Sequence, residues 1–154
     1  MRLPTQGIVT MSVKETLTNV NIIVVLPGMR ELCFCGRVEK GEGMATKMGC
    51  PTANIAVEQG AVIPALGVYV GHTEFEGGRF PSLICINDGR TGYRLKMEVH
   101  LLHQDGINLT GKRLDVILCD KLRDLVPFPG EEEMAKMIKV DIQKADEWFA
   151  VHKD

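Results

Sequence analysis

Residues 67–87, with the sequence GVYVGHTEFEGGRFPSLICIN, give the clearest indication of the fold. The first part, residues 67–73, is rich in β-branched and aromatic side chains, which favour extended strands. Residues 76–79 (EGGR) are typical of a hairpin turn, because glycine adopts the backbone angles that tight turns need. We therefore predict a strand, a turn and a return strand over residues 80–87, which Asn87-Asp88-Gly89 ends.

Further short strands are predicted on both sides of this hairpin. Residues 32–38 and 53–57 precede it, and residues 93–102 and 113–118 follow it. In residues 93–102 apolar and polar side chains alternate, which indicates a strand with one buried face. Residues 21–26 could add an extra strand.

The pattern changes from strand to helix after residues 127–130 (PFPG). Three glutamates, at 131–133, crowd the first turn, where the helix dipole favours negative charge. An apolar stripe then recurs at intervals of three and four residues, at Met134, Met137, Ile138, Ile142, Ala145, Trp148 and Phe149. About six strands followed by one helix predict a mainly β protein, a small closed barrel with the helix packed outside.

Composition limits the classes of protein that fit this chain. Its 154 residues are 45% hydrophobic and 25% charged, which is ordinary for one globular domain. A net charge of −2 leaves no electrostatic footprint for nucleic acid, and no run is long and apolar enough for a membrane span. We expect a monomer, because the sequence shows no heptads and no long bare apolar edge.

The five cysteines are scattered and odd in number, which argues against a disulfide framework and for a reducing compartment. We interpret all five as small core residues: Cys33, Cys35, Cys50, Cys85 and Cys119. Residues 1–30 are expected to be an extension of unknown role, and residues 31–154 the domain. The extension is only weakly similar to an organelle transit peptide, so we expect a cytoplasmic protein, with an organellar address as the alternative.

Residues 41–54 (GEGMATKMGCPTAN) carry the first functional motif. Glycines let backbone amides approach a ligand closely, and Lys47 adds a positive charge. Thr52 and Asn54 offer the oxygen ligands that Mg²⁺ prefers. The segment lacks the spacing of a Walker A loop or a dinucleotide-binding fingerprint. It is typical of a phosphate and magnesium site, although a glycine-rich stretch between strands is often only a loop.

A second motif, residues 97–103 (MEVHLLH), favours the functional interpretation. Joined in this order, the motifs make the chain resemble riboflavin kinase (flavokinase) in its monofunctional, eukaryote-type form. The resemblance covers roughly residues 32–149. It rests on Gly41, Gly43, Lys47, residues 49–54 (GCPTAN), 67–69 (GVY), 97–100 (MEVH), 111–112 (GK) and the final helix.

The resemblance implies a six-stranded antiparallel Greek-key barrel with a C-terminal helix. It also implies a reaction, ATP plus riboflavin giving ADP plus FMN, assisted by Mg²⁺ or Zn²⁺. The implied site residues are Glu98 as general base; Gly41, Gly43, Lys47, Thr52, Leu101 and His103 for ATP; Thr52 and Asn54 for the metal; and Arg123 and Phe128 for the flavin. Many bacterial relatives of this kind are fused to an adenylyltransferase that makes FAD. We expect this chain to stop at FMN, because thirty leading residues cannot hold that domain.

The chemistry suits Glu98, since a carboxylate within hydrogen-bond reach can take the proton of an alcohol. The alternative is a solvated glutamate paired with Lys96 or His100 on an exposed strand face. A zinc site made by Glu98, His100 and His103 is disfavoured, because His103 would point away from the other two if the strand continued.

Two departures from the family pattern are visible. Thr110 stands where the family often has an aromatic residue near the nucleotide, and no acidic residue is cleanly placed after Arg123. The Thr110 departure keeps open an alternative, a catalytically inactive barrel that binds flavin or nucleotide. A barrel that binds RNA or protein is a third possibility, disfavoured by the acidic charge and by the 5% aromatic content.

Overall fold

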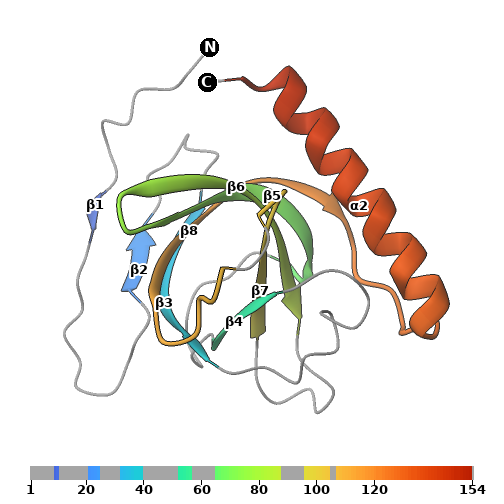
Figure 1. Ribbon diagram of the computed structural model, residues 1–154, viewed down its shortest axis with the longest axis horizontal. Helices are drawn as coiled ribbons and strands as arrows, with labels where there is room; N and C mark the ends of the chain where they lie inside the picture. Colours follow the sequence, from blue (N-terminus) through green and yellow to red (C-terminus); the bar gives the residue numbers. More distant parts are fainter. Residues whose placement is uncertain are drawn as a thin grey trace.

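The computed structural model describes residues 9–10, 21–24, 32–39, 52–56, 65–87, 96–104 and 107–153. Six antiparallel strands close into a barrel in the order β3-β4-β7-β6-β5-β8, and β8 pairs back to β3 (Figure 1). Their bounds are β3 Leu32–Glu39, β4 Ala53–Ala56, β5 Gly67–Phe75, β6 Gly78–Asn87, β7 Lys96–Leu101 and β8 Arg113–Arg123.

The connectivity is that of a Greek key. Strands β5, β6 and β7 are consecutive neighbours, and β8 returns to lie beside β5. The predicted six-stranded Greek-key barrel is therefore confirmed. Two short strands extend the sheet beyond the barrel: β1 (Val9–Thr10) pairs with β2 (Asn21–Val24), which pairs with β3. The extra strand predicted over residues 21–26 is confirmed as β2.

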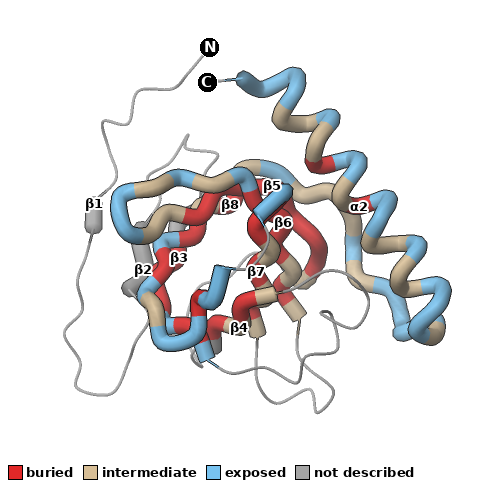
Figure 2. Tube along the Cα trace, in the orientation of Figure 1, coloured by how far each residue is buried: buried red, intermediate tan, exposed pale blue. Residues whose placement is uncertain are grey.

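Alternation along the strands builds the barrel interior. In β7, the side chains of Met97, Val99 and Leu101 are buried, while those between them are half-exposed. Figure 2 shows buried residues along the barrel strands and mostly exposed ones on the helix. The interior cluster consists of Phe34, Val38, Ala53, Ile55, Tyr69, Ile84, Ile86, Met97, Val99, Leu101, Leu109, Leu114, Val116 and Leu118.

The hairpin between β5 and β6 turns at Glu76 and Gly77, as predicted from the EGGR segment. Both residues have positive φ, 48° and 79°, which is the requirement of a two-residue type I′ turn. On its other edge β5 pairs with β8 through two register shifts. At the second shift Gly71 is required, because a Cβ there would lie 1.8 Å from the carbonyl oxygen of Ile117.

Strand β8 is longer than the sequence pattern predicts, since it continues past residue 118 to Arg123. The alternation of buried and exposed residues fades in this half, because the register shifts against β5 interrupt the regular pairing. The longer strand matters for the site, because Arg123 lies at its end.

One long helix, α2 (Glu131–Val151), runs along the outside of the barrel (Figure 1). It begins after Gly130 with Glu131, Glu132 and Glu133 in its first turn, as predicted. Its C-terminal half covers β5 and β6 through a second apolar cluster. That cluster contains Val68, Val70, Leu83, Leu102 and Ala145, with Cys85, Leu122, Leu125, Ile142, Trp148 and Phe149 packed against it. Within the described ranges, no helix has the length and apolar content that crossing a membrane requires.

The cysteine prediction is only partly correct. Cys35 is buried, but Cys85 and Cys119 are half-buried on the outer face of the barrel. Each follows a residue whose side chain fills the interior, Ile84 and Leu118, so alternation turns its thiol outward. The side chain of Cys33 and all of Cys50 lie outside what the structure describes.

Candidate active site

A row of cross-strand partners on the outer face joins residues from both sequence motifs. Asn54 of β4 lies directly opposite Glu98 of β7, and Glu98 lies opposite Cys85 of β6. Cys85 is opposite Val68 of β5, which is opposite Arg123 of β8. The Cβ atoms of such partners are about 4.5–5.5 Å apart. We call these five residues the Glu98 row.

The strand alternation explains why this row faces outward. Met97 and Val99, on either side of Glu98, are 0% and 1% exposed inside the barrel. Ala53 and Ile55 flank Asn54 in the same way. Glu98 and Asn54 are half-buried, so both are within reach of a ligand on the outer surface.

Asn87, at the end of β6, contacts the carboxylate of Glu98. Its Nδ2 donates a hydrogen bond to Glu98 Oε2 over 3.1 Å, and the same nitrogen lies 3.7 Å from Cys85 Sγ. Sequence reasoning missed this contact, because the sequence around Asn87 indicates only the end of a strand. The signal was available in part, since Asn87 and Cys85 lie on one face of β6 at a spacing of two.

Cys85 contributes a neutral group to the row. Burial first, and then the nearby charge of Glu98, raise the pKa of its thiol to about 11. At neutral pH the thiol therefore keeps its proton, and it adds no second negative charge beside Glu98.

Arg123 is held by Asp141 of α2. The Nε and Nη2 atoms of the arginine each donate to one carboxylate oxygen over 2.8 Å, and Nη1 donates to the carbonyl of Asp124 over 3.1 Å. The hydrogen bonds that Arg123 donates to Asp141 raise the pKa of Arg123 above its usual value. The pair thus joins the end of the Glu98 row to the helix. Asp141 was also missed, although it lies on the apolar stripe of the helix and is only 3% exposed.

Phe128 lies between β8 and α2, in residues 124–130. It is 55% exposed, which is unusual for a phenylalanine in a folded domain. The structure thus presents an aromatic ring on the segment that links Arg123 to the helix.

Leu101 and His103 do not join the row. The side chain of Leu101 is inside the barrel, so only its main chain faces a ligand outside. Strand β7 ends at Leu101, and His103 follows in a turn with φ of 58°, where its Nε2 lies 2.7 Å from Asp146 Oδ1. Their assignment to the nucleotide site stays a prediction.

Of the phosphate loop, the structure describes only its end. Gly41, Gly43 and Lys47 lie outside the described residues, whereas Thr52 is half-buried immediately before β4. Thr52 and Asn54 are two positions apart, the spacing that puts side chains on one face of an extended segment. Among the described side chains, no three of His, Cys, Asp and Glu gather as a metal site. The oxygen donors of Thr52 and Asn54 suit Mg²⁺, which is commonly held by few protein ligands together with substrate phosphates.

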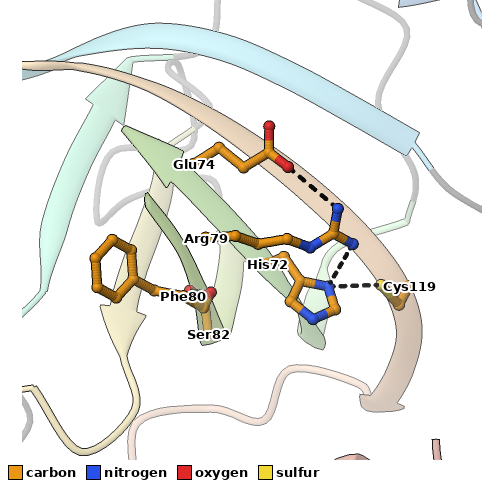
Figure 3. Close-up of polar contacts among 6 residues, drawn as sticks. All are labelled: His72, Glu74, Arg79, Phe80, Ser82 and Cys119. Carbon is orange, nitrogen blue, oxygen red and sulfur yellow. Dashed lines mark hydrogen bonds and ion pairs between the residues drawn. The ribbon is translucent and has the colours of Figure 1, made fainter. Parts of the chain in front are cut away.

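A second polar cluster lies toward the hairpin end of the barrel (Figure 3). Arg79 donates to Glu74 Oε1 over 3.1 Å and to His72 Nδ1 over 3.2 Å, and Cys119 Sγ lies 3.7 Å from the same ring nitrogen. Because a guanidinium only donates, Nδ1 accepts and the ring proton is on Nε2.

A groove of about 410 Å³ adjoins this cluster and is separate from the Glu98 row. It is lined by Glu74, Phe75, Glu76, Gly77, Gly78, Arg79, Arg113 and Asp115. Arg79 and Cys85 are six residues apart on β6, which corresponds to roughly 20 Å at the rise of a strand. The groove brings none of the predicted site residues together.

The fold and the Glu98 row define a small closed-barrel domain that presents a carboxylate and an amide oxygen side by side on its outer face. The family model described as Flavokinase, riboflavin kinase, matches residues 29–149. The chain belongs to the flavokinase family.

Curated relatives are bifunctional riboflavin kinase/FMN adenylyltransferases. The protein from Pseudomonas fluorescens is 32% identical over 123 residues, covering 75% of this chain and 38% of the relative. The one from Haemophilus influenzae is 29% identical over 153 residues, covering 96% and 48%. The chain thus spans less than half the length of these relatives.

Two solved structures share the fold. A macrolide-efflux protein from Streptococcus pneumoniae superposes with a TM-score of 0.67 at 24% identity, over 76% of this chain and 39% of that one. Riboflavin kinase from Trypanosoma brucei superposes with a TM-score of 0.57 at 20% identity, over 80% and 82%. At these identities the likeness shows the fold alone.

Proposed function

We propose that this chain transfers the γ-phosphoryl group of ATP to the 5′-hydroxyl of riboflavin, giving FMN and ADP. The observation that carries the proposal is the register that sets Asn54 directly opposite Glu98 on one outer face. The two residues come from separate motifs, and membership of the flavokinase family supports reading them together.

In this proposal Glu98 is the general base. The ribityl hydroxyl oxygen attacks the γ-phosphorus, the bond to the β,γ-bridging oxygen breaks, ADP leaves, and Glu98 takes the hydroxyl proton. Proton removal by a positioned carboxylate is typically worth ~10²–10⁴-fold in rate. The rest of the catalysis is positioning and charge neutralisation, as in phosphoryl transfer generally.

Thr52 and Asn54 would hold the divalent cation beside this carboxylate. A cation bound there would neutralise charge on the phosphates. The side-chain oxygens of Thr52 and Asn54 favour Mg²⁺ over Zn²⁺ as that cation. We assign the nucleotide to the same side, with Gly41, Gly43 and Lys47 cradling its phosphates. Leu101 and His103 are assigned to the rim of this nucleotide site.

We assign the flavin to the outer face next to residues 124–130. Phe128 offers an exposed ring for stacking against a flat heterocycle. Arg123 contributes by holding the start of this segment against α2 through Asp141. A cytoplasmic, reducing location is part of the proposal, supported by the free thiols of Cys35, Cys85 and Cys119.

The test is FMN formation from riboflavin and Mg²⁺-ATP, followed by chromatography. We expect Glu98→Gln to lose turnover by ~10²-fold or more and to retain riboflavin binding, measured by flavin fluorescence. Glu74→Gln is the matched control, because it makes the same change in the polar cluster at the hairpin end, and it should leave turnover unchanged. Thr52→Ala should weaken the binding of Mg²⁺, so that turnover needs a higher Mg²⁺ concentration.

Two outcomes would change the proposal. Full turnover in Glu98→Gln would remove the general base assignment. Riboflavin binding without FMN from the unaltered protein would favour the inactive binding module.

We also propose that the chain is monofunctional, in contrast to its bifunctional relatives. Incubating the protein with FMN and Mg²⁺-ATP tests this directly. We expect no FAD, and FAD formed at a rate comparable to that of FMN would contradict it.

A further inference from the structure

We propose that Asn87 is a positioning residue for Glu98, whose amide fixes the orientation of the carboxylate. The inference rests on the proposed role of Glu98 as general base. It assigns to Asn87 a function that neither sequence motif contains.

The contact has the geometry of a good hydrogen bond between diagonal neighbours. Asn87 pairs in register with Lys96 and Cys85 pairs with Glu98, so Asn87 reaches Glu98 across one step of the sheet. The 3.1 Å separation of Nδ2 and Oε2 is within the range of an N–H···O hydrogen bond. The opposite amide orientation would put Oδ1 against a carboxylate oxygen, and two acceptors repel.

The amide gives Glu98 a neutral hydrogen-bond donor in a region with several ionisable groups. On the same face of β7 lie Lys96 and His100, and on β6 lies Cys85; beyond Asn54 lies Glu39 of β3, and beyond Val68 lies the Arg123–Asp141 pair. A general base must lie within hydrogen-bond reach of the proton it takes. An amide that fixes one carboxylate oxygen therefore also fixes where the other oxygen can reach.

Two variants of Asn87 separate positioning from general structural support. Asn87→Ala removes the donor. Asn87→Asp keeps the shape but places a like charge against Glu98. Measured as single-turnover phosphoryl transfer, the rate should fall ~10-fold or more in both, and further in Asn87→Asp, because the carboxylate loses its fixed orientation.

A further readout does not depend on the rate alone. The KM for ATP should change less than ~2-fold, since a loss confined to the base lowers the chemical step rather than substrate binding.

The chain offers a matched control on α2. Gln143 Nε2 donates to Glu147 Oε1 over 3.2 Å on an exposed face, so Gln143→Glu makes the same amide-to-acid change beside a carboxylate. It should leave the single-turnover rate unchanged.

The outcomes keep the two proposals distinct. If Glu98→Gln loses turnover while both Asn87 variants keep the single-turnover rate of the unaltered protein, the role of Asn87 is wrong and that of Glu98 stands. If both variants raise the KM for ATP as much as they lower the rate, Asn87 is only structural. If Glu98→Gln retains turnover, the general base proposal fails first, whatever the Asn87 variants do.

Discussion

At the scale of the residue, Glu98 has uncharged groups as its described cross-strand and hydrogen-bonding neighbours. Asn87 donates a hydrogen bond to it, and Cys85 across the strand remains a neutral thiol. Asn54, its partner on β4, carries an uncharged amide. These neighbours suit the general base that we propose at Glu98.

The described thiols give a prediction at this scale. Burial raises the pKa of both Cys35 and Cys85 from 9.0 to about 11, so the thiolate fraction at about pH 8 is ~100-fold below that of an unfolded thiol. We expect both to resist alkylation by iodoacetamide in the native protein and to react rapidly in urea, as mapped by mass spectrometry. Native labelling at the unfolded rate would contradict this.

The same pKa shift has a consequence for stability. A thiol whose pKa is higher in the folded state binds its proton more strongly there, so its contribution to stability is complete below pH 9.0 and is lost as the pH rises toward about 11. The free energy of unfolding should therefore fall over this interval, and less so in the Cys85→Ser variant.

Sequence reasoning reached Glu98 and Asn54 but not Asn87, for a physical reason. Alternation along a strand says which face a side chain occupies, and it correctly separated Glu98 from Met97 and Val99. It does not give the register between strands, on which a diagonal contact such as Asn87 to Glu98 depends.

At the scale of the element, α2 is fixed to the barrel by an apolar cluster and by one buried ion pair. The side chain of Asp141 is 4% exposed and that of Arg123 is 20% exposed. Around this pair, His103 contacts Asp146 and the indole of Trp148 donates to Asp120 over 3.1 Å. The helix is therefore attached along its middle and C-terminal turns, while its first turn is exposed.

The ion pair gives a prediction for stability. Arg123→Ala leaves a buried carboxylate without its partner, which should lower the free energy of unfolding by about 3–5 kcal/mol in urea denaturation. The double variant Arg123→Met with Asp141→Leu should cost less than the single one, because no charge is left buried. Lys136→Ala, which breaks only exposed pairs with Glu132 and Glu133, is the control at about 0–1 kcal/mol. A loss for Arg123→Ala as small as the control would overturn the assignment.

The sequence predicts which face of the helix Asp141 occupies, but not which residue it contacts. It lies four residues after Met137 and four before Ala145, so helical periodicity places it on the buried stripe. A lone acid in an apolar stripe indicates a buried partner but does not name it. Arg123, eighteen residues earlier, became the partner because β8 extends further than its alternation predicted.

At the scale of the whole molecule, closure of the barrel holds the Glu98 row together. Five strands supply its members, and the pairing of β3 with β8 completes the ring of hydrogen bonds.

The barrel strands and the helix could be predicted from the sequence, because the two-residue spacing of a strand and the three- and four-residue spacing of a helix are local patterns. The strand order could not be derived from those patterns and came from the family resemblance, since pairing between distant segments leaves no local signal.

Ligand binding should stabilise the molecule as a unit. If riboflavin and Mg²⁺-ADP bind the folded protein only, concentrations of ~100 times their dissociation constants should each add about 2.7 kcal/mol. We expect a rise in Tm by scanning calorimetry, with the part that depends on Mg²⁺ reduced in Asn54→Ala. An unchanged Tm for the unaltered protein at high ligand concentration would contradict both assigned sites.

The tight turn at Glu76 and Gly77 has a practical consequence for protein engineering. Both residues are exposed, and the space around Gly77 is open. The tip is at the far end of β6 from Cys85, so a peptide tag inserted between the two residues would sit away from the Glu98 row. One extra residue within β6 would instead exchange the inward Ile84 and Ile86 with the outward Cys85. The hairpin tip is therefore the place to attach a fluorophore or a surface anchor, and the strand itself is not.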